Sequence, residues 1–158
     1  MAALQSGQIA ATTVAIPLNY AAEEAGFNIV GRLIDAIPEY ELGTLAVKKS
    51  WAEKNRPLVV RFMKALALTH RWLYENKEAA IDFLAREMQL KPSHARRGWE
   101  YYTQHQIWHP DADLSLKGTE YAIRTYLDQT GGKAQLTSLA KYVDQSYLSD
   151  ALKELSRK

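Results

Sequence analysis

The first third of the chain contains short apolar runs rich in β-branched residues, which predict β-strands. There are three such runs, at residues 10–16, 28–33 and 43–48. Between the first two, residues 18–25 predict a helix that follows Pro17 and ends at Gly26. A connection of this length is the minimum for a crossover between parallel strands, so a strand–helix–strand unit is expected. Residues 35–43 show no clear period and predict a loop.

After residue 49 the apolar positions recur at the spacing of three and four residues that is typical of amphipathic helices. Ser50 is expected to cap a short turn, and five longer helices are expected to start at Pro57, Asn76, Ser93, Ser115 and Ser146. Gly131 and Gly132 are expected to end the fourth of these helices. The apolar stripes include Val59, Phe62, Met63, Phe83, Met88, Tyr126, Leu148, Ala151 and Leu152.

The predicted fold class is therefore α/β, with a small mixed sheet and flanking helices. Three short strands offer little area to five amphipathic helices, each of which needs an apolar surface to cover. At least one edge of such a sheet would be unpaired and able to accept another strand. We therefore expect part of the fold to be supplied from elsewhere, by a missing N-terminal portion or by a second subunit.

Composition narrows the class of protein. The chain has 158 residues, 47% hydrophobic and 24% charged, and a formal net charge of +2, which is typical of one ordinary folded domain. Two excess positive charges are far fewer than the clustered basic residues of a nucleic-acid-binding surface, so no nucleic-acid partner is expected. The absence of cysteine excludes disulfides and thiolate chemistry. Residues 1–7 lack the basic and apolar regions of a signal peptide.

No residue pattern indicates catalysis, a cofactor or a metal ion. His105 and His109 have a spacing that can bind zinc on a helix, but Pro110 ends the helix and no further ligands follow. We expect both, like His70, to be packing residues. Acidic residues form no glycosidase or metal pair, and the basic residues around Arg96 are interrupted by Glu100. The chain is therefore not expected to be an enzyme.

The turn between the first predicted strand and its helix is the best candidate for a binding site. Pro17, Asn19 and Tyr20 stand at the carboxyl end of that strand. Open α/β sheets bind ligands at this position, and free N–H groups at a helix start favour anions. Asn19 is expected to donate or accept hydrogen bonds, and Tyr20 to form an aromatic wall. The alternative is that this is an ordinary strand-to-helix junction without a ligand.

Several segments, in order along the chain, resemble periplasmic substrate-binding proteins of ABC importers, in the nitrate, sulfonate, taurine and thiamine-pyrimidine group. The opening ALQSGQIAA (3–11) and PLNYAAEEAG (17–26) are similar to that family's motifs. So are the segment RWLYENKEAAI (71–81) and the terminal KYVD…YL (141–148). One departure is Ala10, which stands where the family usually has Asp.

The resemblance implies the C-terminal half of a type II periplasmic-binding-protein fold. Residues 1–40 would be the end of one ligand-binding lobe, and residues 41–158 the return crossing and helices of the other. Tyr40, Glu41 and Thr44, near the return crossing, would join the residues of the turn as ligand contacts. Such proteins are usually about twice this length and carry a signal peptide. One of the two lobes that enclose the ligand would therefore be missing from this chain.

The resulting expectation is a partial solute-binding component of an ABC importer. It would capture a small anionic or heterocyclic solute such as a sulfonate, nitrate or a pyrimidine, and its full-length parent would work in the periplasm with an ABC permease. The alternative is a non-catalytic helical module without a ligand, which self-associates as a homo-oligomer through its exposed sheet edge and helix faces.

Overall fold

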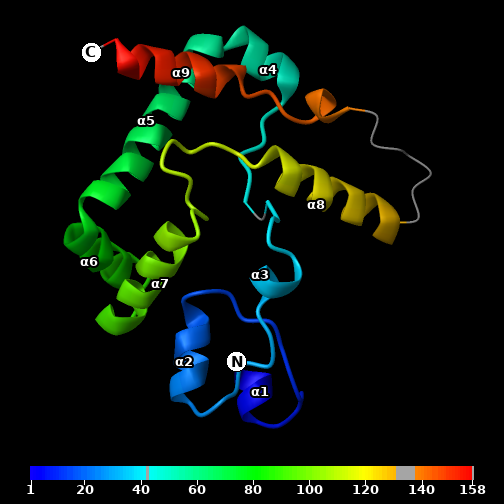
Figure 1. The fold of residues 1–158 in the computed structure, drawn as a ribbon, viewed down its shortest axis with the longest axis vertical. Helices are drawn as coiled ribbons and strands as arrows, with labels where there is room; N and C mark the ends of the chain where they lie inside the picture. Colours follow the sequence, from blue (N-terminus) through cyan, green and yellow to red (C-terminus); the bar gives the residue numbers. More distant parts are fainter. Residues whose placement is uncertain (42, 131–137, 158) are drawn as a thin grey trace. The chain divides into compact units, whose positions relative to one another are not determined.

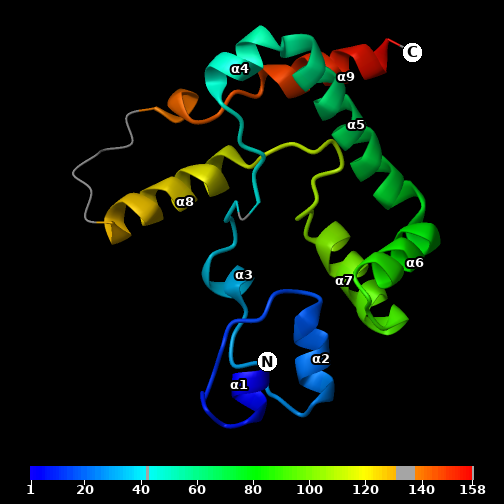
Figure 2. The ribbon, with the colours of Figure 1, turned by 180° about the vertical axis from the view of Figure 1, so that it is seen from behind.

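The computed structural model describes residues 1–41, 43–130 and 138–157, and within these ranges the regular structure is entirely helical (Figures 1 and 2). The helices are α1 (Ala2–Gln5), α2 (Leu18–Glu24), α3 (Leu33–Ala36), α4 (Lys49–Lys54), α5 (Arg56–Glu75), α6 (Lys77–Glu87), α7 (Pro92–Gln104), α8 (Leu116–Gln129), the 3-10 helix η1 (Leu139–Lys141) and α9 (Ser146–Ser156). Among the described residues, no helix is long and apolar enough to cross a membrane.

The predicted α/β class with a small mixed sheet is wrong, because the described residues contain no strand. The three runs predicted as strands have no regular secondary structure, and residues 33–36 of the predicted strand and loop form α3. Within the described residues, no backbone–backbone hydrogen bond involves residues 10–14, 28–32 or 43–47. A strand exists only when its backbone is paired with another. Strand-like composition without a pairing partner therefore leaves these runs irregular.

The helices largely follow the prediction. Gly26, with φ of 85°, follows the C-cap of α2 in the left-handed conformation that glycine tolerates. Ser115 caps α8, since its hydroxyl accepts a hydrogen bond from Gly118 N at 3.0 Å. Three other predicted caps differ. Ser50 lies inside α4, whose N-cap is Lys48. Pro92 opens α7 after Lys91, so Ser93 lies inside that helix, and Ser146 is the first residue of α9. Gly131 and Gly132, the predicted end of α8, lie outside the described residues.

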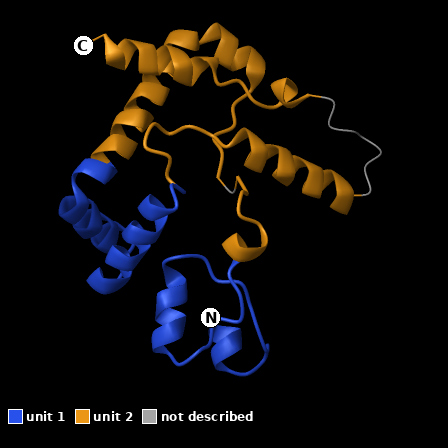
Figure 3. Cartoon of the chain, viewed as in Figure 1, with its two compact units in different colours: residues 1–32, 73–107 blue, residues 33–72, 108–158 orange. Residues whose placement is uncertain are grey.

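The chain divides into two compact units (Figure 3). Unit 1 contains residues 1–32 and 73–107, and unit 2 contains residues 33–72 and 108–158. Each unit therefore combines two segments that are distant in sequence.

Unit 1 is held by the hairpin of α6 and α7, against which α2 packs. Ile81 on α6 is 1% exposed, and Ala80 and Ala95 are buried with it. The Trp99 indole on α7 donates a hydrogen bond to Leu73 O at 2.9 Å. Pro17 lies against Gly98, where a Cβ would come within 3.1 Å of the proline ring. The small residues of α7 thus let the chain before α2 approach closely.

Unit 2 has its core where α9 meets α4 and α5. Ala52, Val60, Tyr147 and Ala151 form this buried cluster, and Val59 and Met63 pack against it. Arg56 connects the same elements, since its guanidinium lies 4.5 Å from the centre of the Tyr147 ring and pairs with Asp150. Of the predicted stripe positions, Phe62 and Tyr126 stay exposed in unit 2, and Phe83 and Met88 stay exposed in unit 1. Fewer apolar side chains are therefore buried than the helical spacing of apolar residues predicts.

Candidate functional site

The predicted ligand-binding turn lies in unit 1, immediately before α2. Pro17 is buried, and two backbone N–H groups that follow it already have acceptors within the turn. Asn19 N donates to Ala15 O at 3.2 Å, and Tyr20 N donates to Pro17 O at 3.1 Å. These two amides are not free for an anion, in contrast to the expectation from the sequence. The anion-binding capacity of the turn is correspondingly reduced.

Asn19 carries an unsatisfied acceptor. Its Nδ2 donates a long hydrogen bond of 3.4 Å to Glu23 Oε1, one turn along α2. Its Oδ1 is buried and has no hydrogen-bond partner within the described part of the chain. A buried acceptor without a donor costs about 1–3 kcal/mol, so native structures rarely leave one without a reason.

Tyr20 is enclosed by α7. Its side chain is 6% exposed, and the Arg97 guanidinium lies over its ring at 3.8 Å from the centroid. The hydroxyl donates to Arg97 O at 3.3 Å, and the His94 ring is 6.2 Å away between centroids. Burial raises the pKa of the Tyr20 phenol, although the nearby Arg97 charge opposes the shift. One face of the proposed aromatic wall is therefore occupied by arginine.

A cluster of ionic hydrogen bonds fixes α2 on α7. Glu24 accepts hydrogen bonds from Lys91 Nζ at 2.5 Å and lies 2.8 Å from Nε2 of the buried His94. These two contacts, the Lys91 bond first, lower the pKa of the Glu24 carboxyl. Arg97 pairs with Glu23 at 2.8 Å. The basic segment around Arg96 is thus engaged with acidic partners, since Arg96 itself pairs with Glu78.

The remaining three predicted contacts lie in unit 2, where two of them, Tyr40 and Glu41, contact α8 or its N-cap. Tyr40 packs edge-on against Tyr121, with 6.0 Å between the ring centroids. Glu41 accepts a hydrogen bond from Ser115 N through Oε2 at 3.0 Å. Thr44 is exposed. The structure thus brings together Pro17, Asn19 and Tyr20 within unit 1, and Tyr40 and Glu41 within unit 2.

The histidines singled out in the sequence make structural contacts. His105 is the C-cap of α7, and its ring packs at a tilt of 46° against Tyr101, with 4.4 Å between ring centroids. His70 Nδ1 lies 2.8 Å from His109 O. In the described ranges, no three histidine or acidic side chains are grouped to hold a metal ion.

Sequence reasoning missed a pocket of about 530 Å³ in unit 2. Its floor is one stripe of α9, and its other side is formed by Asp111, Asp113 and Arg71. The apolar part of the stripe, Leu148 and Leu152, was predicted. Ser149 and Lys153, which are also four residues apart, form the neighbouring row of the same helix. The approach of residues 111–113 to α9 has no local signal, because it joins segments more than thirty residues apart.

Comparison with known proteins identifies no relative. No protein-family model, no curated protein and no solved structure matches the chain.

Proposed function

We propose that the chain is the solute-binding part of an ABC importer, which captures a small anionic or heterocyclic solute such as a sulfonate, nitrate or a pyrimidine. The support from the sequence is the ordered series of similarities between residues 3 and 148. The same resemblance makes an ABC permease the partner of the full-length parent and the periplasm its location. No covalent step is part of the proposal.

The observation that carries the proposal is the unpartnered Oδ1 of Asn19. An acceptor of this kind gains most from a ligand that brings an N–H donor, because the ligand removes the cost of leaving the oxygen unpaired. Nitrate has no N–H group, whereas a pyrimidine base has two. Since the amides of Asn19 and Tyr20 are also engaged within the turn, the geometry favours the heterocyclic solute over the anionic one.

The test is a thermal-shift assay of the whole chain with uracil, nitrate and methanesulfonate. Uracil is expected to raise the melting temperature, and 1,3-dimethyluracil, which keeps the ring but lacks both N–H donors, is expected to have no effect. Asn19→Leu should abolish the uracil shift, while the exposed Asn28→Ala should retain it. The proposal fails if none of the solutes raises the melting temperature, or if Asn19→Leu responds as the unmodified chain does.

The second candidate function is a self-associating module without a ligand. It is favoured by exposed apolar side chains on segments whose backbone has no hydrogen-bond partner in the described part of the chain: Val30 is 92% exposed and Leu45 is 66% exposed. A stable contact between copies would bury on the order of 1,600 Å². Light scattering separates the two candidates, because a strictly monomeric chain that responds to uracil would contradict self-association.

A further inference from the structure

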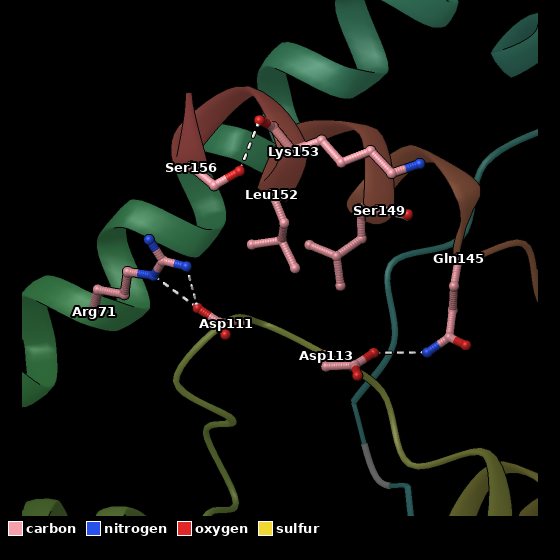
Figure 4. A pocket seen from close by; sticks show the side chains of 9 residues that line it. Arg71, Asp111, Asp113, Gln145, Ser149, Leu152, Lys153 and Ser156 are labelled. Atoms are coloured by element: carbon pink, nitrogen blue, oxygen red, sulfur yellow. Dashed lines mark hydrogen bonds and ion pairs between the residues drawn. The ribbon is translucent and has the colours of Figure 1, made fainter. Parts of the chain in front are cut away.

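The pocket of unit 2 combines an apolar floor with a carboxylate that has no cationic partner among the described residues (Figure 4). Leu148 and Leu152 form the floor, and the Leu152 side chain points from α9 toward the segment that carries Asp111 and Asp113 (Figure 4). This arrangement suits a ligand with an aliphatic body and one charged end.

The two carboxylates of the pocket differ in their charge balance. Asp111 Oδ1 is held by Arg71, at 2.7 Å from Nε and 2.6 Å from Nη2. Asp113 has no ion pair with any described residue. Its Oδ1 instead accepts neutral hydrogen bonds, from Gln145 Nε2 at 2.6 Å and from Leu114 N at 2.8 Å. The uncompensated negative charge of the pocket is therefore at Asp113.

Three acceptors in the lining of the pocket remain open. Asp113 Oδ2, Gln145 Oε1 and Ser149 Oγ have no hydrogen-bond partner among the residues that the structure describes. A primary ammonium group has three N–H donors and a positive charge. Lys153, the cation that α9 contributes to the pocket lining, has a side chain that is 67% exposed. It lies 3.9 Å from Asp150, a carboxylate that also pairs with Arg56, and it forms no ion pair with Asp113 among the described residues.

We propose that this pocket binds an alkylammonium ion, a primary aliphatic amine in its charged form. The ammonium group is held by Asp113, with hydrogen bonds to Gln145 and Ser149, and the alkyl chain covers Leu148 and Leu152. None of the six residues proposed to bind the solute lines this pocket, so the two proposals stand or fall separately.

The experiment is a titration of the whole, isotope-labelled chain with n-butylammonium, followed by amide chemical shifts in NMR spectra. We expect saturable shifts in α9 and in residues 111–115. Two probes separate the interactions: 1-butanol keeps the chain but lacks the charge, and butyltrimethylammonium keeps the charge but lacks N–H donors. Each is expected to bind at least about tenfold more weakly, because a hydrogen bond to a charged group is worth that factor or more.

Two variants locate the site. Asp113→Asn keeps Oδ1 for Gln145 and Leu114 but removes the charge, and is expected to weaken butylammonium binding about tenfold or more. Ser149→Ala removes one exposed acceptor and is expected to weaken it about two- to fivefold. Asp128→Asn, on the exposed face of α8, is the matched control and should bind as the unmodified chain does. Absence of saturable shifts, equal binding of butanol, or an unchanged affinity in both Asp113→Asn and Ser149→Ala would overturn the proposal.

Discussion

Gly118 on α8 occupies a position where a side chain has no room. A Cβ at this residue would lie 2.9 Å from Glu41 N and 3.3 Å from the Tyr40 carbonyl carbon. Both atoms belong to backbone that cannot rotate away. We therefore predict that Gly118→Ala lowers the free energy of unfolding by about 1–3 kcal/mol, measured by urea titration. Gly43→Ala, where no atom lies within 4 Å of the added Cβ, is the control. Equal stability of the two variants would contradict the contact between α8 and residues 40–41.

Glu24 gives unit 1 a predicted dependence on pH. Its pKa is lowered in the folded chain by the bonds from Lys91 and His94. A carboxyl whose folded pKa lies below its unfolded value stabilises the fold above the unfolded pKa, and this contribution disappears as the pH falls through the folded pKa. The urea midpoint should therefore fall between about pH 6 and about pH 3 less steeply in Glu24→Gln than in the unmodified chain.

The matched control for this pH dependence is Glu53→Gln. Its carboxylate is exposed and lies 4.0 Å from Lys49 Nζ, so its removal should leave the slope unchanged. If Glu24→Gln and Glu53→Gln show the same slope as the unmodified chain, the ionic cluster between α2 and α7 does not form in solution.

At the residue scale, the sequence predicts what is decided locally. The cap at Ser115 and the glycine at position 26 follow from backbone chemistry within a few residues. The partners of Tyr20 and Asp113 could not be predicted, because Arg97 and Gln145 come from distant parts of the chain. The unsatisfied Asn19 oxygen could not be predicted either, since its burial depends on tertiary packing.

At the scale of elements, the hairpin of α6 and α7 depends on one large buried side chain. Ile81 is 1% exposed, whereas Phe83 on the same helix is 46% exposed. Ile81→Ala is predicted to lower the free energy of unfolding by about 2–5 kcal/mol, through lost burial and the cavity left behind. Phe83→Ala should change it by at most about 1 kcal/mol. Chemical denaturation followed by circular dichroism measures both changes. If Phe83→Ala lowered the free energy of unfolding more than Ile81→Ala does, the face of α6 that carries Phe83 would be the buried one, in contradiction to the structure.

Helices were predicted well and strands were not, for one physical reason. A helix closes its hydrogen bonds within its own segment, so the spacing in residues 57–75 is enough to indicate it. A strand needs a second segment, and the β-branched composition of residues 10–16 does not supply one. Apolar spacing also overestimates burial, as the exposed Phe62 and Tyr126 illustrate.

At the scale of the whole molecule, the account depends on segments that are apolar but unpaired. Residues 28–32 and 43–47 carry Val30, Leu45 and Val47, all exposed, on backbone without hydrogen-bond partners in the described ranges. Self-association starts from this condition, whereas solute binding rests on the Asn19 acceptor in the first turn of α2. They differ in whether the chain gains order from a ligand at Asn19 or from another copy.

The most direct measurement is amide hydrogen exchange of the whole chain in solution, resolved along the sequence. Slow exchange is expected in α5, α6 and α7, where backbone amides are bonded within helices. Residues 10–14, 28–32 and 43–47 should exchange as fast as an unstructured peptide, because their amides have no backbone acceptor within residues 1–41, 43–130 and 138–157. Protection of these three segments equal to that of the helices would show that they are paired, and would contradict the helical fold described for this chain.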